Sequence, residues 1–294
     1  MQKACEFDQE LLILFDAYVH GSIDRRTFLA RAGKFAVGTM TAASLLAALS
    51  PDFASAQVIK PDDQRLRFES VVYPSPQGYE KTRGYLVQQA EGDAKRPGIL
   101  VVHENRGLNP HIEDITRRLA LDGFLAFAPD ALAPLGGYPG DEDKARELFA
   151  TLDQSKTRQD MLAAGRYLKG LPECSGKIGV VGFCWGGGIS LMVATQMPDL
   201  NACAAFYGNQ PAADQAAKIK SPLLMHYAEN DPRINAGRAA WEEALKAAKV
   251  PYTSYSYPGT QHGFNNNTTP RYDEAAAQLA WQRTLAFFNE HLRS

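Results

Sequence analysis

The chain has 294 residues, with 31 Lys and Arg against 33 Asp and Glu, a formal net charge of −2 and 45% apolar residues. Disordered chains combine low hydrophobicity with high net charge, and electrostatic nucleic-acid binders carry a basic excess, so this composition excludes the first class and disfavours a nucleic-acid partner. We therefore expect a folded protein whose partner is a small molecule or another protein.

The first 56 residues contain the pattern of an export signal. Paired arginines in Asp-Arg-Arg-Thr-Phe-Leu (24–29) precede an uncharged run from Phe35 to Pro51, and Ala54-Ser55-Ala56 matches a small-x-small cleavage site. This segment resembles a twin-arginine export signal. It predicts a periplasmic or secreted protein that uses the twin-arginine export machinery and loses residues 1–56.

The alternative for residues 1–56 is a helical N-terminal arm that stays attached, with the protein in the cytoplasm. Phe7, Leu11, Phe15 and Tyr18 are spaced at i, i+4, i+8 and i+11, which places them on one face of a helix.

Residues 57–294 are expected to form one catalytic domain. Two β-rich segments, 65–73 and 82–89, flank a turn rich in proline and glycine, which predicts a hairpin. Apolar runs of strand length then alternate with helical segments, a pattern typical of a mostly parallel sheet covered by helices on both faces. The expected strands are 98–103, 124–128, 178–182, 202–206, 222–226 and 252–257, and the expected helices are 112–121, 158–168, 235–248 and 272–292.

A predicted strand runs directly into Gly182-Phe-Cys-Trp-Gly186, and a helical segment follows. The G-x-S-x-G elbow of α/β hydrolases has this arrangement, with glycines where the turn is strained and the backbone packs closely. Here Cys184 replaces the serine. The amino end of a helix stabilises a thiolate, so we expect Cys184 to be the nucleophile. Cys203, within an apolar segment, is expected to be a core residue, and a disulfide between Cys174 and Cys203 is left open.

A thiolate nucleophile needs a base, and the base needs an acidic group that orients it. After an elbow the acid should precede the histidine, each just past a strand. Asp231 and His262 satisfy this order, with Glu229 as the rival acid. The other histidines are weaker candidates because they lie in apolar strands, at helix ends or in the leader: His103, His226, His111, His291 and His20.

The backbone N–H groups of Trp185 and Asn105 are the expected oxyanion donors. Trp185 directly follows the nucleophile, and Asn105 lies in the loop after the strand 98–103. No C-x-x-C pair and no Cys/His cluster occurs along the sequence, so we predict no metal site.

The chain from Arg96 to His291 resembles the dienelactone hydrolase family. The marks of the resemblance are the Gly182–Gly186 motif, Asn230-Asp231, His262-Gly-Phe264 and Val102-His-Glu-Asn105. It implies an α/β-hydrolase fold, a triad of Cys184, Asp231 and His262, and hydrolysis of enol-lactones and related esters without a metal or organic cofactor. It also implies that Glu104 contacts the nucleophile and takes part in its activation.

The sequence departs from the family in one stretch. Members that cleave dienelactone place an arginine shortly after the histidine, to bind the substrate carboxylate, whereas Asn265-Asn266-Asn267 stands here. Arg106 or Arg271 could replace it, because a guanidinium fork suits a carboxylate. The loop 133–140 could cover the site as a lid or serve as an ordinary connection.

These observations predict a hydrolase of carboxylic esters or lactones that forms a thioester on Cys184. Two alternatives remain open at this stage. The same triad could transfer the acyl group to another acceptor or cleave peptides, or the fold could serve as a non-catalytic binding protein.

Overall fold

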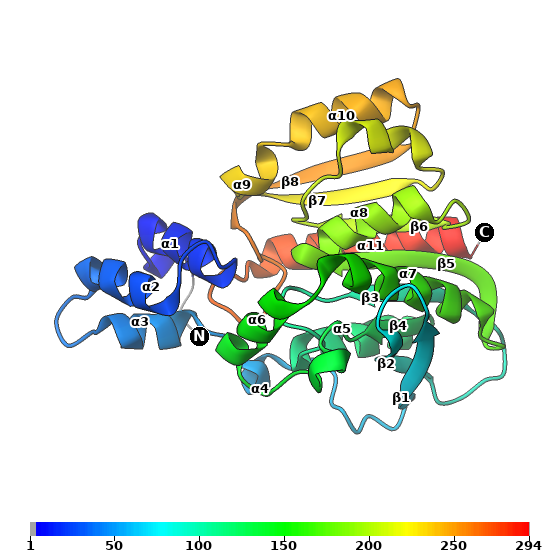
Figure 1. Ribbon diagram of the computed structural model, residues 1–294, viewed down its shortest axis with the longest axis horizontal. Coiled ribbons are helices and arrows are strands. Elements are labelled where there is room, and N and C mark those ends of the chain that lie inside the picture. Colours follow the sequence, from blue (N-terminus) through cyan, green and yellow to red (C-terminus); the bar gives the residue numbers. More distant parts are fainter. Residues whose placement is uncertain (1–3, 294) are drawn as a thin grey trace.

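The computed structural model describes residues 4–293 as helices packed on one eight-stranded sheet with the order β1-β2-β4-β3-β5-β6-β7-β8 (Figure 1). The two first strands form the predicted antiparallel hairpin, β2 pairs antiparallel with β4, and all other neighbours are parallel. The strands are β1 (Leu66–Ser75), β2 (Glu80–Gln89), β3 (Arg96–Val102), β4 (Leu125–Pro129), β5 (Cys174–Phe183), β6 (Ala202–Phe206), β7 (Leu223–Asn230) and β8 (Tyr252–Gln261).

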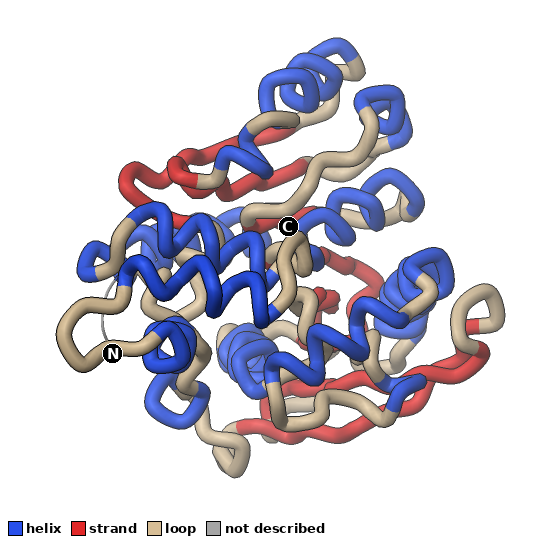
Figure 2. The backbone as a smooth tube through the Cα atoms, turned by 60° about the vertical axis from the view of Figure 1, so that its left-hand side comes forward, coloured by secondary structure: helices blue, strands red, loops and turns tan. Residues whose placement is uncertain are grey.

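Helices cover both faces of the sheet, as Figure 2 shows. Along β3, Ile99 and Val101 belong to the apolar core under α5 (Pro110–Leu121) and α11 (Glu274–Leu292). Leu100 and Val102 belong to the opposite core, to which helices on the other face contribute: α6 (Glu142–Thr151), α7 (Gln154–Gly170), α8 (Trp185–Gln196) and α10 (Arg238–Ala247). Successive strand residues point to opposite faces, so a strand buried on both faces is apolar throughout. The predicted α/β-hydrolase fold is confirmed.

Two helical predictions are incomplete. The expected helix 235–248 is divided into α9 (Pro232–Asn235) and α10, which begins after Gly237. The helix α6 was not predicted, because its sequence is mostly charged and buries only Ala145 and Phe149. Asp141 caps it by accepting a hydrogen bond from the Lys144 N–H.

Cys174 and Cys203 are free thiols, so the disulfide left open above is not formed. Cys203 is fully buried in the core, and burial raises the pKa of its thiol well above the ordinary value. Within residues 4–293, no helix is both long enough and apolar enough to cross a bilayer.

The N-terminal segment forms a helical unit, which we call the arm (residues 4–56). Three of its helices lie together beside the sheet: α1 (Gln9–Val19), α2 (Arg25–Ala32) and α3 (Ala42–Leu49). The short helix α4 (Phe53–Ala56) lies apart from them, against α5 (Figure 1), and short 3-10 turns occur at Ala4–Glu6 and Gly33–Phe35. Asp8, Asp24 and Thr41 cap the first three helices. The arm has an apolar core of its own, separate from the two cores of the sheet: Leu11, Leu12, Phe15, Tyr18, Phe28, Ala32, Leu45, Leu46 and Leu49.

Candidate active site

Cys184 occupies a strained turn between β5 and α8. Its φ is 56° and its ψ −116°, a conformation that residues with a side chain rarely adopt. A Cβ on Gly182 would lie 2.0 Å from the Gly186 carbonyl oxygen, and one on Gly186 would lie 2.3 Å from that of Val102. Both glycines are therefore required for close backbone packing, as the motif predicts. Trp185 begins α8, so its N–H has no acceptor within the helix and stays a candidate oxyanion donor.

His262 and Asp231 form a buried pair next to this turn. The Nδ1 atom of His262 lies 2.6 Å from Oδ2 of Asp231, the residue that caps α9. Glu229, the rival acid, accepts instead from the Gly259 N–H at 2.8 Å on the exposed end of β7. Of the two carboxylates, Asp231 is thus the one that contacts the imidazole.

The thiol and the imidazole shift each other's ionisation. Burial raises the pKa of Cys184, but His20 and His262 together lower it to about 6. Burial lowers the pKa of His262, but the Cys184 thiolate and Asp231 raise it to about 10. A thiolate beside an imidazolium is the reactive form of a cysteine nucleophile. The buried Nε2 atom of His262 has no hydrogen-bond partner among residues 4–293. In the imidazolium it can give its proton to a leaving group, and the neutral imidazole that remains can accept a proton from water.

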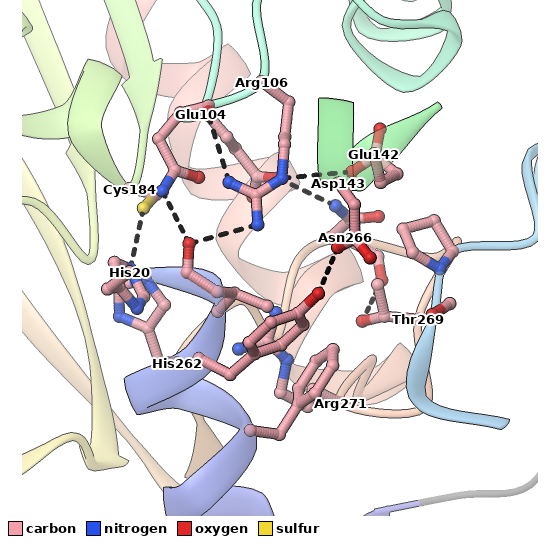
Figure 3. A pocket seen from close by; sticks show the side chains of 16 residues that line it. His20, Glu104, Arg106, Glu142, Asp143, Cys184, His262, Asn266, Thr269 and Arg271 are labelled. Atoms are coloured by element: carbon pink, nitrogen blue, oxygen red, sulfur yellow. Dashed lines mark hydrogen bonds and ion pairs between the residues drawn. The ribbon is translucent and has the colours of Figure 1, made fainter. Parts of the chain in front are cut away.

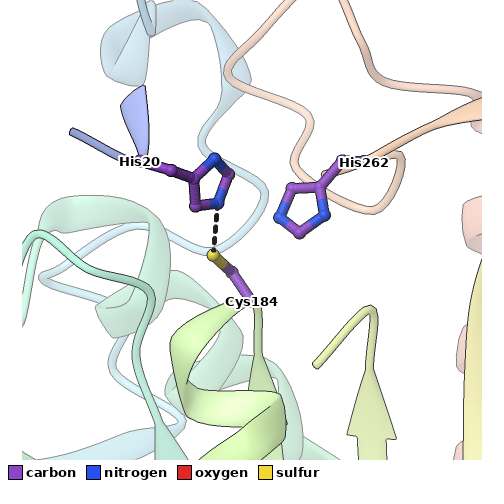
Figure 4. A group of neighbouring side chains, drawn as sticks. All are labelled: His20, Cys184 and His262. Carbon is purple, nitrogen blue, oxygen red and sulfur yellow. Dashed lines mark hydrogen bonds between the residues drawn. The ribbon is translucent and has the colours of Figure 1, made fainter. Parts of the chain in front are cut away.

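His20, from the arm, also reaches the nucleophile. Its Nε2 atom lies 3.2 Å from Sγ of Cys184, and its ring is 4.8 Å from that of His262 (Figure 4). His20 was not predicted as a site residue because residues 1–56 have the pattern of an export signal. The available signal was the helical stripe through Phe15 and Tyr18, which ends just before His20.

Asn105 and the two candidate substrate-binding arginines, Arg106 and Arg271, contact the arm. Asn105 Nδ2 and Arg106 Nη2 donate to the Val19 carbonyl at 2.9 and 3.1 Å, and Arg271 Nη1 lies 3.5 Å from the Asp16 carboxylate. Arg106 Nε also lies 3.6 Å from the carboxylate of Glu142. Each predicted substrate-binding arginine is therefore paired with a group of this chain.

The carboxylate of Glu104 accepts a hydrogen bond from Asn266 Nδ2 at 3.1 Å. Both residues line the cavity that Cys184 also lines. The expected contact between Glu104 and the nucleophile stays a prediction, as does the oxyanion role of the Asn105 N–H.

The cavity next to Cys184 is small, about 50 Å³, and the arm and the sheet domain line it together (Figure 3). On the arm side its wall includes Phe15, Tyr18, Val19, His20 and Pro51. A second cavity of about 170 Å³ lies on the other side of His20 and shares His20, His262 and Arg271 with the first. The loop 133–140 does not line either cavity, so the part of the described chain that covers the nucleophile is the arm.

Sγ of Cys184 and the nearest imidazole nitrogens of His20 and His262 lie within 4.8 Å of one another. Thiolates and imidazoles are zinc ligands in general. Here, however, the guanidinium Nη2 of Arg233 lies 3.0 Å from Nε2 of His20, and this positive charge opposes a second cation. The trio is better explained as acid–base machinery around a nucleophile.

A sheet of this order, covered on both faces, with a nucleophile at a strand–turn–helix elbow, defines an α/β hydrolase. The model of the dienelactone hydrolase family matches residues 82–292, and a model described as YqhI-like matches residues 1–36. The chain belongs to the dienelactone hydrolase family.

Relatives extend over most of the chain. A protein of Escherichia coli (strain K12) described as "Putative carboxymethylenebutenolidase" is 32% identical over 260 residues, which cover 83% of this chain and 94% of that protein. The "Putative hydrolase fragment YghX" of the same organism is 49% identical over 114 residues, 39% of this chain and 97% of the fragment. A crystal structure described as "Putative Dienelactone Hydrolase" from Klebsiella pneumoniae is 27% identical, with a TM-score of 0.67, and the match covers 76% of this chain and 99% of that one. The protein is therefore a hydrolase of the dienelactone hydrolase and carboxymethylenebutenolidase kind.

Proposed function

We propose that this hydrolase cleaves carboxylic esters or lactones by covalent catalysis on Cys184, with His262 and Asp231 as the other members of the triad. The observation that carries the proposal is the 2.6 Å contact between His262 Nδ1 and Asp231, which leaves Nε2 free beside the strained cysteine turn. Because the Nδ1–H of His262 donates to the Asp231 carboxylate, the imidazole is held in the tautomer in which Nε2 acts as a base.

In the first half-reaction, the thiolate sulfur attacks the carbonyl carbon and a C–S bond forms. The N–H groups of Trp185 and Asn105 are the proposed donors to the oxyanion. The C–O bond then breaks, and the alkoxide leaves with the proton that the thiol had carried. In the second, water attacks the thioester and passes a proton to His262, which returns it to the departing sulfur.

We infer that neutral substrates are processed at least as well as anionic ones. The three asparagines supply no charge where the family's dienelactone-cleaving members have an arginine. Arg271 lies against the carboxylate of Asp16, and Arg106 against that of Glu142. An anionic substrate would therefore have to displace a carboxylate of the chain itself to gain a bidentate arginine contact.

A substrate panel tests this function. Neutral p-nitrophenyl esters of graded chain length and small lactones are compared with analogues that carry a carboxylate, and the protein mass is recorded during turnover. We expect hydrolysis, no preference for the anionic analogues, and an acyl adduct on Cys184. A strong preference for anionic lactones that Arg106→Ala or Arg271→Ala abolishes would contradict the charge assignment. A product transferred to an added alcohol or amine would indicate an acyltransferase, and the absence of both turnover and adduct would indicate a binding protein.

We also propose that the chain is exported and keeps its arm. The arginine pair and the uncharged run that follows it support a periplasmic location reached through the twin-arginine machinery. Retention is supported by the contacts between arm and sheet domain, including the 2.7 Å ion pair of Arg25 with Asp143. Cleavage after Ala56 would remove these contacts and His20.

The mass and N-terminal sequence of the protein, isolated from separated cell fractions of its natural host, test this second proposal. We expect a periplasmic chain that still contains His20. A periplasmic chain that begins at Gln57 would show that the arm is a cleaved signal, and a cytoplasmic chain would show that it is not an export signal.

A further inference from the structure

The arm places a second histidine on the nucleophile. The 3.2 Å contact between His20 Nε2 and Cys184 Sγ joins a segment outside the match to the dienelactone hydrolase family with the reacting atom of that family's elbow. His262, the triad histidine, has no hydrogen bond at its Nε2 in the same arrangement. In this structure the short contact of the thiol is therefore the one to the arm.

His20 is oriented in the same way as the triad histidine. Its Nδ1 atom lies 2.8 Å from the Asp16 carbonyl oxygen and 3.2 Å from the Asp16 carboxylate, one helical turn earlier in α1. This contact places the Nδ1 proton toward Asp16 and leaves the Nε2 lone pair facing both the thiol and the guanidinium Nη2 of Arg233, which lies 3.0 Å away and must turn toward Asp16 before Nε2 can take up a proton. Two pairs, Asp16–His20 and Asp231–His262, thus converge on one sulfur atom.

The surroundings of Asp16 keep its carboxyl group ionised. Burial raises its pKa, but hydrogen bonding to His20 and the charges of His262 and Arg271 hold the pKa well below its usual range. The guanidinium groups of Arg233 and Arg271 lie 3.7 and 3.5 Å from its two oxygens. A carboxylate fixed in this way stabilises a protonated His20 as Asp231 stabilises a protonated His262.

Many of the contacts that join the arm to the sheet domain are polar. Its apolar core is separate from those of the sheet. Contacts across the boundary include the reciprocal side-chain pair Gln9–Gln261, the Tyr18–Asp143 hydrogen bond and the Arg146 contact to the Tyr18 carbonyl. Interfaces of this polar type permit relative motion of the parts they join. A substrate needs such motion to reach Cys184, because the cavity of about 50 Å³ has only one third of the volume of a cavity that holds benzene, roughly 150 Å³.

We propose that His20 is a catalytic residue of this hydrolase, supplied by the arm, and that Asp16 is its positioning residue. The proposal rests on the ester or lactone hydrolysis inferred above. The S–H bond of Cys184 breaks, its proton passes to Nε2 of His20, and the electron pair remains on sulfur. After the C–S bond has formed and the C–O bond has broken, His20 returns this proton to the alkoxide oxygen. His262 serves the water of the second half-reaction.

The charged and titratable groups that face this assembly come from several elements. Asp16 belongs to α1, Arg233 to α9, and Glu142 and Asp143 to α6. The others belong to the elbow or to loops at the carboxyl ends of the strands: Cys184, His262, Asp231, Arg271, Arg106 and Glu104. Among them, His20 lowers the pKa of Cys184 the most. Removing its imidazole should therefore move the ionisation of the thiol and leave the Asp231–His262 pair in place.

The test uses the full chain with His20→Gln, and His291→Gln as the matched control at the far end of α11. For hydrolysis of p-nitrophenyl acetate we expect kcat/KM of His20→Gln to fall about 10²-fold, the lower end of what a general base supplies. We also expect the pH midpoint for alkylation of Cys184 by iodoacetamide to rise above that of the wild type, because His20 lowers the pKa of the thiol. His291→Gln should match the wild type in both, and Asp16→Asn should shift both in the direction of His20→Gln by a smaller amount.

The outcomes separate the possible roles of the arm. An unchanged kcat/KM in His20→Gln would overturn the proposal, and so would an increase, which would make the arm an inhibitory cap. A loss of rate with an unshifted alkylation profile would show a purely structural role and would also overturn it. A thermal unfolding curve equal to that of the wild type shows that the variant is folded. An acyl adduct on Cys184 in the wild type supports the proposed hydrolysis independently, so failure of the His20 role leaves that function intact.

Discussion

Replacing Cys184 by alanine is expected to abolish ester hydrolysis and to leave the fold intact. The substitution removes only the sulfur that attacks the carbonyl, and alanine keeps the Cβ that the turn already accommodates at a φ of 56°. Without a nucleophile, neither half-reaction can proceed through a thioester. Turnover of p-nitrophenyl acetate and the thermal unfolding curve measure the two effects separately.

Cys203→Ala is the matched control for this experiment. Cys203 is a fully buried cysteine of β6, away from the elbow, and its protonated thiol is packed in the core. Its replacement should lower the melting temperature, because it leaves a cavity in the core, and should have little effect on the turnover rate. Wild-type turnover by a clean Cys184→Ala preparation would contradict covalent catalysis on this residue.

Asp231→Asn is expected to lower kcat by about 10²–10⁴-fold. The amide can favour the wrong imidazole tautomer at His262, and it no longer stabilises the imidazolium. The pKa of His262, about 10 with its present neighbours, should fall, so the alkaline limit of activity should move to lower pH. The pH dependence of kcat and kcat/KM provides the measurement.

Glu229→Gln is the control for the acid, because Glu229 has the same charge and lies two residues earlier. Its carboxylate bonds the Gly259 N–H and not His262, so its loss should leave the pH profile unchanged. A loss of turnover in Glu229→Gln together with normal turnover in Asp231→Asn would reverse the assignment.

The fold could be predicted from the sequence because its physical causes are local. A strand buried on both faces must be apolar along its whole length, as 98–103 and 202–206 are, and this pattern identifies a parallel sheet. The elbow was predictable for a similar reason, since Gly182 and Gly186 leave no room for a Cβ. Asp231 and His262 followed from the order in which an elbow's partners occur along the chain.

His20 could not be placed in the site from the sequence. Its role depends on how the arm docks onto the sheet domain, through contacts between residues such as Gln9 and Gln261 that are 252 positions apart. Neither helical periodicity nor a local motif encodes that docking. The same segment also has the pattern of an export signal, which favoured its interpretation as a leader. Helix α6 was not predicted because it buries only Ala145 and Phe149 and so shows no long apolar stripe. The break before α10 falls at Gly237, and the apolar pattern on either side of it does not reveal it.

Several of the contacts that attach the arm are ion pairs, and this makes its docking sensitive to the surrounding salt. Its bonds to the sheet domain include the ion pairs of Arg25 with Asp143 and of Asp16 with Arg233 and Arg271, of which the first is exposed. The Debye length shortens from about 10 Å at 0.1 M ionic strength to about 3 Å at 1 M, so exposed pairs weaken while the apolar cores do not. Concentrated salt should therefore weaken the docking of the arm and loosen the cover over the nucleophile before it unfolds the hydrolase.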